Sequence, residues 1–295
     1  MTPQFLCVGE VLWDALPGGL FLGGAPFNVA CHLHEIGERV TFASRLGDDE
    51  LGREITRRLI RRGISTDLVQ IDKKLPTGFV IVELGLDGVP TYEIVEPSSW
   101  DSITADEALV KCAEAAQAVV FGSLAQRSET SRHTIELLTA SNPNCVFDVN
   151  LRPPFDIREV VEFSLKSAKI VKLNDEELSR LIDWFDLPEP LQDGAESLAE
   201  RFECETVCVT QGENGAALLH GDMWVEHPGF VVDVADTVGS GDAFLAALLS
   251  GLLADHDPEQ VLISANAMGA FVATQHGATP AHDPEAIDQL RGSRQ

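Results

Sequence analysis

The stretch Asp236-Thr237-Val238-Gly239-Ser240-Gly241-Asp242-Ala243-Phe244 combines residue types that can bind an anion and accept a proton. Leucines then recur at spacings of three and four residues, which predicts a helix with a buried face. Gly239 to Asp242 would stand at the start of that helix, where free backbone N–H groups and the helix dipole attract an anion. An anion site beside a carboxylate base is what phosphoryl transfer to a hydroxyl requires. The alternative is an aspartate that serves only the helix N-terminus.

A second glycine-rich stretch, Gly23-Gly24-Ala25-Pro26-Phe27-Asn28-Val29-Ala30, places two glycines before another predicted helix. The glycines let a ligand approach the backbone closely, and Asn28 offers the donor and acceptor that sugar hydroxyls require. The alternative is a tight turn in which Asn28 bonds to its own helix end. Asp14 could bind a pair of hydroxyls at the same place, or form an Asx-turn ahead of Pro17.

Several common site motifs are missing from the sequence. It contains no Gly-x-x-x-x-Gly-Lys-Ser/Thr P-loop, and no Gly-x-Gly-x-x-Gly follows the first predicted strand. His32 and His34 lie two apart on a predicted helix and so point in different directions, which makes them a poor metal-binding pair. These absences argue against P-loop and dinucleotide-binding enzymes.

The charge balance is strongly acidic, with 21 Lys and Arg against 47 Asp and Glu and a net charge of −26 over 295 residues. This balance argues against general binding to nucleic acid or to anionic membranes. The six scattered cysteines predict buried free thiols and a reducing compartment. The N-terminal residues lack a signal-peptide pattern, and no run approaches the ~20 apolar residues of a membrane span. We therefore expect a cytoplasmic protein.

Alternating strand and helix patterns predict an α/β fold with a mostly parallel sheet covered on both faces. Strands are expected at 5–13, 40–44, 118–121, 145–149, 168–173 and 206–210, with a hairpin at 216–227. Helices are expected near 25–36, 50–62, 128–139, 158–166, 174–182, 191–202, 241–254, 258–275 and 284–290. Two strand-like runs at 77–84 and 89–96, joined by Gly85-Leu86-Asp87-Gly88, interrupt this alternation and predict an accessory sheet or lid.

Polar residues follow several predicted strands directly. They are Asp14, Asn150-Leu151-Arg152, Asn174 and Thr210-Gln211-Gly212. Ligands of parallel sheets gather at the carboxyl ends of the strands, so we expect these residues to share one site.

Taken together, the chain resembles the ribokinase-like (PfkB) carbohydrate and nucleoside kinases. The stretch 236–244 is similar to the C-terminal signature of that family, and the stretch 23–30 to its N-terminal signature. Further matches are Gly9-Glu10 with Asp14, Gly47-Asp48-Asp49 with Gly52, Asn174-x-x-Glu177, the stretch 209–215, Asn266 and Gly277-Ala278. The resemblance implies a single three-layer α/β/α domain over residues 1–295, with lid strands at about 15–23 and 76–97.

The resemblance also implies an ATP-dependent sugar kinase and a role for each matching residue. Asp242 would be the general base, and the backbone N–H groups of Gly239, Ser240 and Gly241 would form the anion hole. Asp14, Gly24 and Asn28 would bind the sugar, and Asn174, Thr210, Gly212, Gly215 and Asn266 the nucleotide. Asn174 and Glu177 would hold Mg²⁺, largely through water, while Asp236, Val238 and Gly277 match the position of a possible K⁺ ion.

The sequence points less clearly to the identity of the sugar substrate. The Gly-Gly-Ala-Pro form at 23–26 and Asp148-x-Asn-Leu-Arg152 resemble fructokinases, which favours fructose as substrate and fructose 6-phosphate as product. Arg152 also resembles the residue that pairs with the carboxylate in 2-keto-3-deoxygluconate kinases, or it faces a phosphate or solvent. Ribokinase, nucleoside kinase and a non-catalytic nucleotide- or sugar-binding protein stay open, as does a homodimer.

Overall fold

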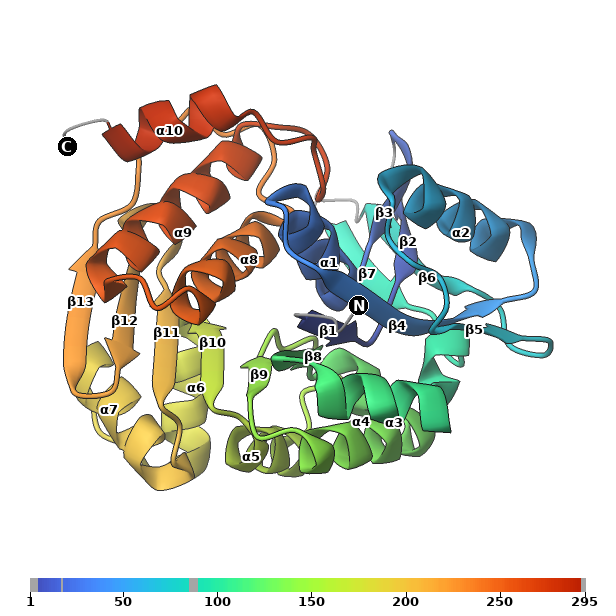
Figure 1. Ribbon diagram of the computed structural model, residues 1–295, viewed down its shortest axis with the longest axis horizontal. Helices are drawn as coiled ribbons and strands as arrows, with labels where there is room; N and C mark the ends of the chain where they lie inside the picture. Colours follow the sequence, from blue (N-terminus) through green and yellow to red (C-terminus); the bar gives the residue numbers. More distant parts are fainter. Residues whose placement is uncertain (1–4, 17, 85–89, 293–295) are drawn as a thin grey trace.

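The computed structural model describes residues 5–16, 18–84 and 90–292. A nine-stranded sheet runs through the middle of the molecule (Figure 1). Its strands are β1 (Phe5–Val8), β4 (Val40–Gly47), β5 (Val69–Asp72), β8 (Ala118–Gly122), β9 (Cys145–Asp148), β10 (Ile170–Asn174), β11 (Thr206–Thr210), β12 (Ala216–His220) and β13 (Met223–His227). Their order is β13-β12-β11-β10-β9-β8-β1-β4-β5, and only the β11–β12 and β12–β13 pairings are antiparallel. The predicted mostly parallel α/β sheet is confirmed.

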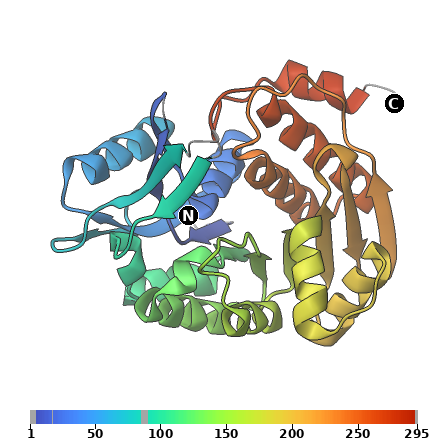
Figure 2. The same cartoon turned by 180° about the vertical axis from the view of Figure 1, so that it is seen from behind.

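Helices cover both faces of this sheet (Figures 1 and 2). One face packs against α1 (Ala25–Glu35), α2 (Glu50–Arg62), α8 (Ser240–Leu253), α9 (Pro258–Ala273) and α10 (Pro284–Gly292). The other packs against α3 (Glu107–Ala115), α4 (Glu129–Ser141), α5 (Arg158–Ser167), α6 (Asp175–Phe185) and α7 (Leu191–Phe202). In β1, Phe5 and Cys7 belong to the first core and Leu6 and Val8 to the second, as alternation along a strand buried on both faces requires.

A second, smaller sheet lies beside the main one, on the right of Figure 1 and the left of Figure 2. Its strands are β2 (Leu12–Leu16), β3 (Gly19–Gly23), β6 (Gly78–Leu84) and β7 (Pro90–Ile94), in the order β3-β2-β6-β7. The expected lid strands at about 15–23 and 76–97 fall on these four elements. The expected turn at Gly85-Leu86-Asp87-Gly88 lies outside the described residues.

The expectation of one continuous strand over residues 5–13 is wrong. The chain leaves the main sheet at Gly9, whose φ of +148° is a conformation that L side chains rarely adopt. A Cβ on Gly9 would also lie 2.7 Å from the ring of Pro26. The crossing is held by the hydroxyl of Ser44, which donates to the Gly9 carbonyl at 2.7 Å. As a result Asp14 lies in the middle of β2 in the small sheet, not at the end of a main-sheet strand.

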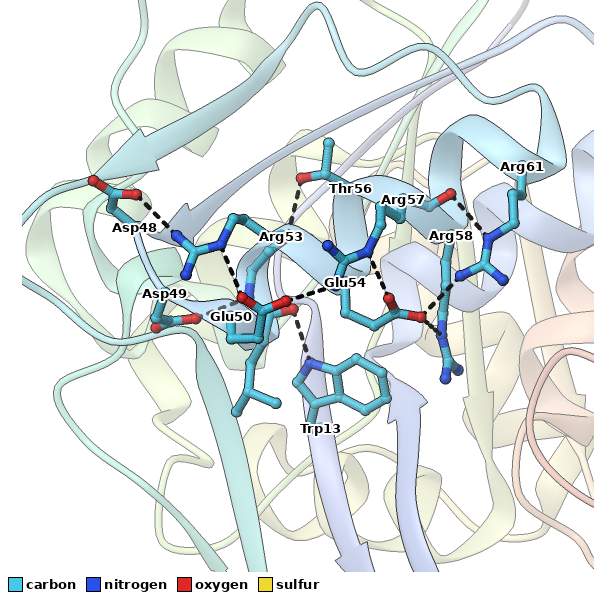
Figure 3. Close-up of polar contacts among 12 residues, drawn as sticks. Trp13, Asp48, Asp49, Glu50, Arg53, Glu54, Thr56, Arg57, Arg58 and Arg61 are labelled. Carbon is cyan, nitrogen blue, oxygen red and sulfur yellow. Dashed lines mark hydrogen bonds and ion pairs between the residues drawn. The ribbon is translucent and has the colours of Figure 1, made fainter.

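Helix α2 contacts the small sheet and the chain entering it at two points, of which Figure 3 shows the one at Trp13. Its N-cap residue Asp49 accepts hydrogen bonds from the Gly52 amide and from both the amide and the hydroxyl of Thr77, at 2.7–2.8 Å. Thr77 directly precedes β6. The indole of Trp13 in β2 donates to the Leu51 carbonyl at 3.3 Å, so one helix contacts both inner strands of the small sheet.

Candidate active site

Helix α8 begins at Gly239, which adopts a φ of +82° as the N-cap residue. A Cβ on this residue would lie 2.3 Å from the Ala278 carbonyl oxygen, so both conformation and space require glycine. The Ser240 amide already donates to the Thr237 carbonyl at 3.2 Å. Of the three backbone N–H groups predicted to form the anion hole, the one of Ser240 is therefore already hydrogen-bonded to the backbone. Its hydroxyl is buried and has no hydrogen-bond partner among the described residues.

Asp242 lies in the first turn of α8 and contacts helix α1 across the molecule. The Asn28 side-chain amide donates to its Oδ2 at 2.8 Å. Burial, together with the negative charge of Asp148, raises the pKa of Asp242 to about 6. A carboxylate with a pKa this close to neutrality is suited to take a proton from a hydroxyl as the reaction proceeds. Asn28 keeps a buried Oδ1 that meets no partner in the described part of the chain.

Two further carboxylates come from the crossing segment and the strand that follows it, Glu10 and Asp14 of β2. Glu10 accepts a hydrogen bond from the Ala25 amide at 3.2 Å, and burial raises its pKa to about 7. Burial also raises the pKa of Asp14 to about 6. Gly24 has a φ of +113°, and its Cβ would lie 2.5 Å from the Glu10 carbonyl oxygen. The glycine at position 24 is thus explained by close packing of two backbone segments, without a ligand.

Arg152 follows β9 and is exposed. Its Nη1 donates to the Leu151 carbonyl at 2.8 Å, and among the described residues no carboxylate forms an ion pair with it. Its positive charge nevertheless lowers the pKa values of Glu10, Asp14 and Asp242. The structure therefore brings these acids and Arg152 into one electrostatic neighbourhood.

A buried ion pair lies beneath the start of α8. Lys172 in β10 and Asp148 at the end of β9 are both buried, with Nζ 3.1 Å from Oδ1. Burial alone would lower the pKa of Lys172, but Asp148, Glu177 and Asp242 raise it to about 12. A Cβ on Gly241 would lie only 3.2 Å from the lysine Nζ. The ammonium group thus adds positive charge directly below the predicted anion hole.

Asn174 and Glu177 form a capping box at the start of α6. The Asn174 side chain accepts from the Glu177 amide at 2.7 Å, and Glu177 accepts from the amides of Asn174 and Leu151 at 2.9 and 2.7 Å. Both oxygens of Glu177 are therefore engaged by the backbone. The described residues include no group of three or more His, Cys, Asp or Glu side chains placed to hold a metal ion directly.

The residues expected to bind nucleotide lie in two elements. Thr210 ends β11, and the turn that follows contains Gly212 and Gly215 at φ values of +56° and +83°. A Cβ on Gly212 would meet nothing within 4 Å, whereas one on Gly215 would lie 1.9 Å from the His227 carbonyl oxygen. Asn266 is buried in α9 and donates to its own helix at Leu262, 2.9 Å away. No hydrogen bond among the described residues joins Asn266 to the turn after β11.

The three positions expected around a monovalent cation do meet. Asp236 accepts from the Val238 amide at 3.0 Å through Oδ1 and from the Gly277 amide at 3.1 Å through Oδ2. This carboxylate therefore ties the loop before α8 to the segment that follows α9.

Residues 17–285 match the pfkB family of carbohydrate kinases. The chain belongs to this family. The match spans both glycine-rich stretches and the site residues from Gly24 to Gly277, while Glu10 and Asp14 lie before it. It confirms the carbohydrate kinase predicted from the sequence.

The names of this kinase's relatives point to more than one kind of acceptor. It is 32% identical to a fructokinase of Klebsiella pneumoniae, over 95% of this chain and 96% of the relative. It is 31% identical to a 2-dehydro-3-deoxygalactonokinase of Haloferax volcanii, over 91% of this chain and 87% of the relative.

Solved structures share the fold of the kinase. A fructokinase double mutant from Vibrio cholerae, in a fructose-, ADP- and potassium-bound form, superposes with a TM-score of 0.83 at 23% identity, covering 98% of each chain. An uncharacterised sugar kinase from Pyrococcus horikoshii gives a TM-score of 0.80 at 27% identity, over 97% of this chain and 99% of the other. The predicted ribokinase-like fold is confirmed. No helix in the described residues is long and apolar enough to cross a membrane.

Sequence reasoning left several contacts at this site unassigned. Glu10 was matched to the family without a function. Lys172 was expected only as one of the positive groups that help to hold ATP, and its ion pair with Asp148 was not foreseen. A lysine within the otherwise apolar strand Ile170–Leu173 was the available signal, since a buried lysine needs a partner. His32 was considered only with His34, although its partners lie more than two hundred residues away.

Proposed function

We propose that this kinase transfers the γ-phosphoryl group of ATP to a primary hydroxyl of a monosaccharide, with fructose as the favoured acceptor. The observation that carries the proposal is the Asn28–Asp242 contact at the N-terminus of α8. It places a carboxylate of raised pKa where a helix dipole favours negative charge.

In the proposed step, Asp242 accepts the proton of the sugar hydroxyl while the hydroxyl oxygen forms its bond to the γ-phosphorus. The bond from that phosphorus to the β–γ bridging oxygen breaks, and ADP leaves with the electron pair. Negative charge on the transferring group would face the ammonium of Lys172 and the N–H groups of Gly239 and Gly241, which have no hydrogen-bond partner in the described part of the chain. Asp14, Gly24 and Asn28 would hold the sugar, with Arg152 at its edge. Thr210, Gly212, Gly215 and Asn266 would bind the nucleotide.

The donors near the phosphates suit a magnesium ion that keeps most of its waters. Both oxygens of Glu177 are already bonded to backbone amides, whereas Asp148 Oδ2 is buried and meets no partner within the described residues. Asn174, Glu177 and Asp148 would therefore hold Mg²⁺ through water. Bound there, the ion would neutralise charge on the ATP phosphates. Asp236, Val238 and Gly277 would flank a K⁺ ion.

Fructose is favoured by the fructokinases among the relatives, at about 30% identity. The competing acceptor is a 2-keto-3-deoxy sugar acid. It is supported by the relative from Haloferax volcanii and by Arg152, an exposed guanidinium with no ion pair among the described residues. A carboxylate is the natural partner for such a group.

The deciding experiment measures ADP release with MgATP and, separately, fructose, 2-keto-3-deoxygluconate, 2-keto-3-deoxygalactonate, ribose or adenosine. Fructose turnover that survives Arg152→Ala supports the favoured acceptor. Turnover of a keto-deoxy acid alone, lost in Arg152→Ala, replaces fructose with the acid. Turnover of none of these compounds rejects the proposed function.

A further inference from the structure

His32 lies on the same face of α1 as Asn28, one helical turn further along. Its ring is fully buried. Its Nε2 is 2.9 Å from the Ala278 carbonyl oxygen, and its Nδ1 is 2.8 Å from Nε2 of His282. One face of α1 thus contacts the candidate base through Asn28 and the segment after α9 through His32.

The partners of His32 fix the direction of both hydrogen bonds. A carbonyl oxygen only accepts, so the His32 Nε2 carries a proton and donates to Ala278. Burial lowers the pKa of His32 to about 3, so the ring is neutral and its Nδ1 accepts. His282 must then donate from its Nε2. The result is a chain of two bonds that runs from His282 through His32 to the Ala278 carbonyl.

Three consecutive residues, Gly277 to Thr279, are each held by a different element. Asp236 accepts from the Gly277 amide, and His32 donates to the Ala278 carbonyl. At the end of α2, Arg62 donates to the Thr279 carbonyl and hydroxyl at 2.7 and 3.0 Å. So many fixed contacts on a short irregular segment restrict how its peptide groups can turn.

This segment packs directly against the start of α8. A Cβ on Gly239 would lie 2.3, 2.6 and 2.8 Å from the O, Cα and C atoms of Ala278. The two backbones are in contact without an intervening side chain. A turn of the Ala278 peptide would therefore displace Gly239 and the N–H groups that follow it.

We propose that His32, supported by His282, is a positioning residue for phosphoryl transfer. It holds the Ala278 peptide against Gly239 and thereby keeps the N–H groups of Gly239 and Gly241 aimed at the transferring phosphoryl group. This role rests on the proposed function, and it acts through the backbone, since the hydrogen bonds of His32 within the described residues go to His282 and Ala278 and not to Asp242.

The test compares His32→Leu, which removes both bonds, with His32→Gln, whose side-chain N–H can still donate to Ala278. Amide hydrogen exchange should become faster over 236–244 and 274–283 in His32→Leu and return towards wild type in His32→Gln. With the sugar that the wild-type enzyme phosphorylates, kcat should fall roughly 10- to 100-fold in His32→Leu with little change in KM. His34→Leu, on the same helix, is the matched control and should change neither measurement.

Exchange is measured without turnover, so it tests the positioning even if the wild-type protein phosphorylates none of the sugars. Unchanged exchange over 236–244 in folded His32→Leu would overturn the proposal. So would wild-type kcat in that variant. If His32→Leu does not fold, His282→Ala serves instead. This variant changes a half-buried residue and removes only the hydrogen bond donated to His32. It should give a smaller effect in the same direction, and wild-type exchange and kcat in it would reject the role.

Discussion

Asn28 donates a 2.8 Å hydrogen bond to Asp242 from 214 residues away in the sequence. The bond joins the first turns of α1 and α8, so the two glycine-rich stretches meet at their helix N-termini. Because the carboxylate is buried, this bond is one of the interactions that hold the pKa of Asp242 down against burial. The pair therefore helps to position the candidate base and lowers a pKa that burial and Asp148 raise.

Replacing the base itself gives the simplest prediction. Asp242→Asn keeps the size of the side chain and loses the proton acceptor, so turnover should fall by about 10²- to 10⁴-fold. ATP binding, measured by calorimetry, should stay close to wild type because the backbone N–H groups remain. Near-normal turnover would mean that another group takes the proton.

Asn28→Ala tests the electrostatic side of the same contact. The hydrogen bond favours the charged carboxylate, so its loss should raise the pKa of Asp242 above about 6. The base is active when deprotonated, so the acidic limb of the kcat/KM profile should move to higher pH. An acidic limb that stays in place while KM rises would restrict Asn28 to sugar binding.

The buried pair of Lys172 and Asp148 should matter for both stability and turnover. Lys172→Met leaves a buried carboxylate without its partner and should cost about 3–5 kcal/mol in the free energy of urea unfolding. Adding Asp148→Asn removes the uncompensated charge and should recover part of that stability. It should not recover turnover, because the positive charge below Gly241 is still missing. Full recovery of both would make the pair purely structural.

At the base of the small sheet, Asp49 caps α2 and binds Thr77. Its neighbour Asp48 is exposed, and among the described residues its side chain pairs with Arg53 at 3.4 Å (Figure 3). Asp49→Ala should cost about 1–2 kcal/mol of unfolding free energy, and Asp48→Ala, the matched control, less than about 1 kcal/mol. Burial raises the pKa of Asp49, but the hydrogen bonds from Thr77 and Gly52 lower it to below its usual range. Its contribution is therefore present at neutral pH and lost as the pH falls through that lowered pKa. Equal losses in the two variants would contradict this account.

Local signals predicted much of the fold. Helix α2 was expected at its observed bounds because its apolar residues repeat at helical spacing and Gly63 ends it. The structure adds Asp49 as the N-cap. No expectation covered β5 or α3. β5 is a four-residue edge strand whose Ile71 is half exposed, and α3 buries only Leu109 and Ala113, so neither shows a clear apolar period.

The sequence predicted which residues form the site but not which of them contact one another. The types and order of residues around Gly24 and Gly239 marked the two helix starts. No sequence signal near Asn28 predicts its contact with Asp242, and none near His32 predicts its contact with Ala278. These pairs come together only when the helices pack on the sheet. The break at Gly9 was missed for the same reason. A glycine inside an apolar run does not reveal that the chain changes sheets there.

Glu10 should make stability depend on pH in the direction opposite to Asp49. Burial raises its folded pKa to about 7, so the folded state holds the proton more tightly than the unfolded chain does. The contribution of Glu10 to stability is therefore greatest below its unfolded pKa of about 4.3. It declines as the pH rises to about 7, and above that pH it stays at its least favourable value. Glu10→Gln keeps an oxygen for the Ala25 amide without the charge. It should therefore raise the unfolding free energy at pH 8 by up to about 4 kcal/mol and have little effect at pH 4.5. Urea unfolding of both proteins at the two pH values measures the difference, and a gain that is equal at both would show that Glu10 does not change protonation on folding.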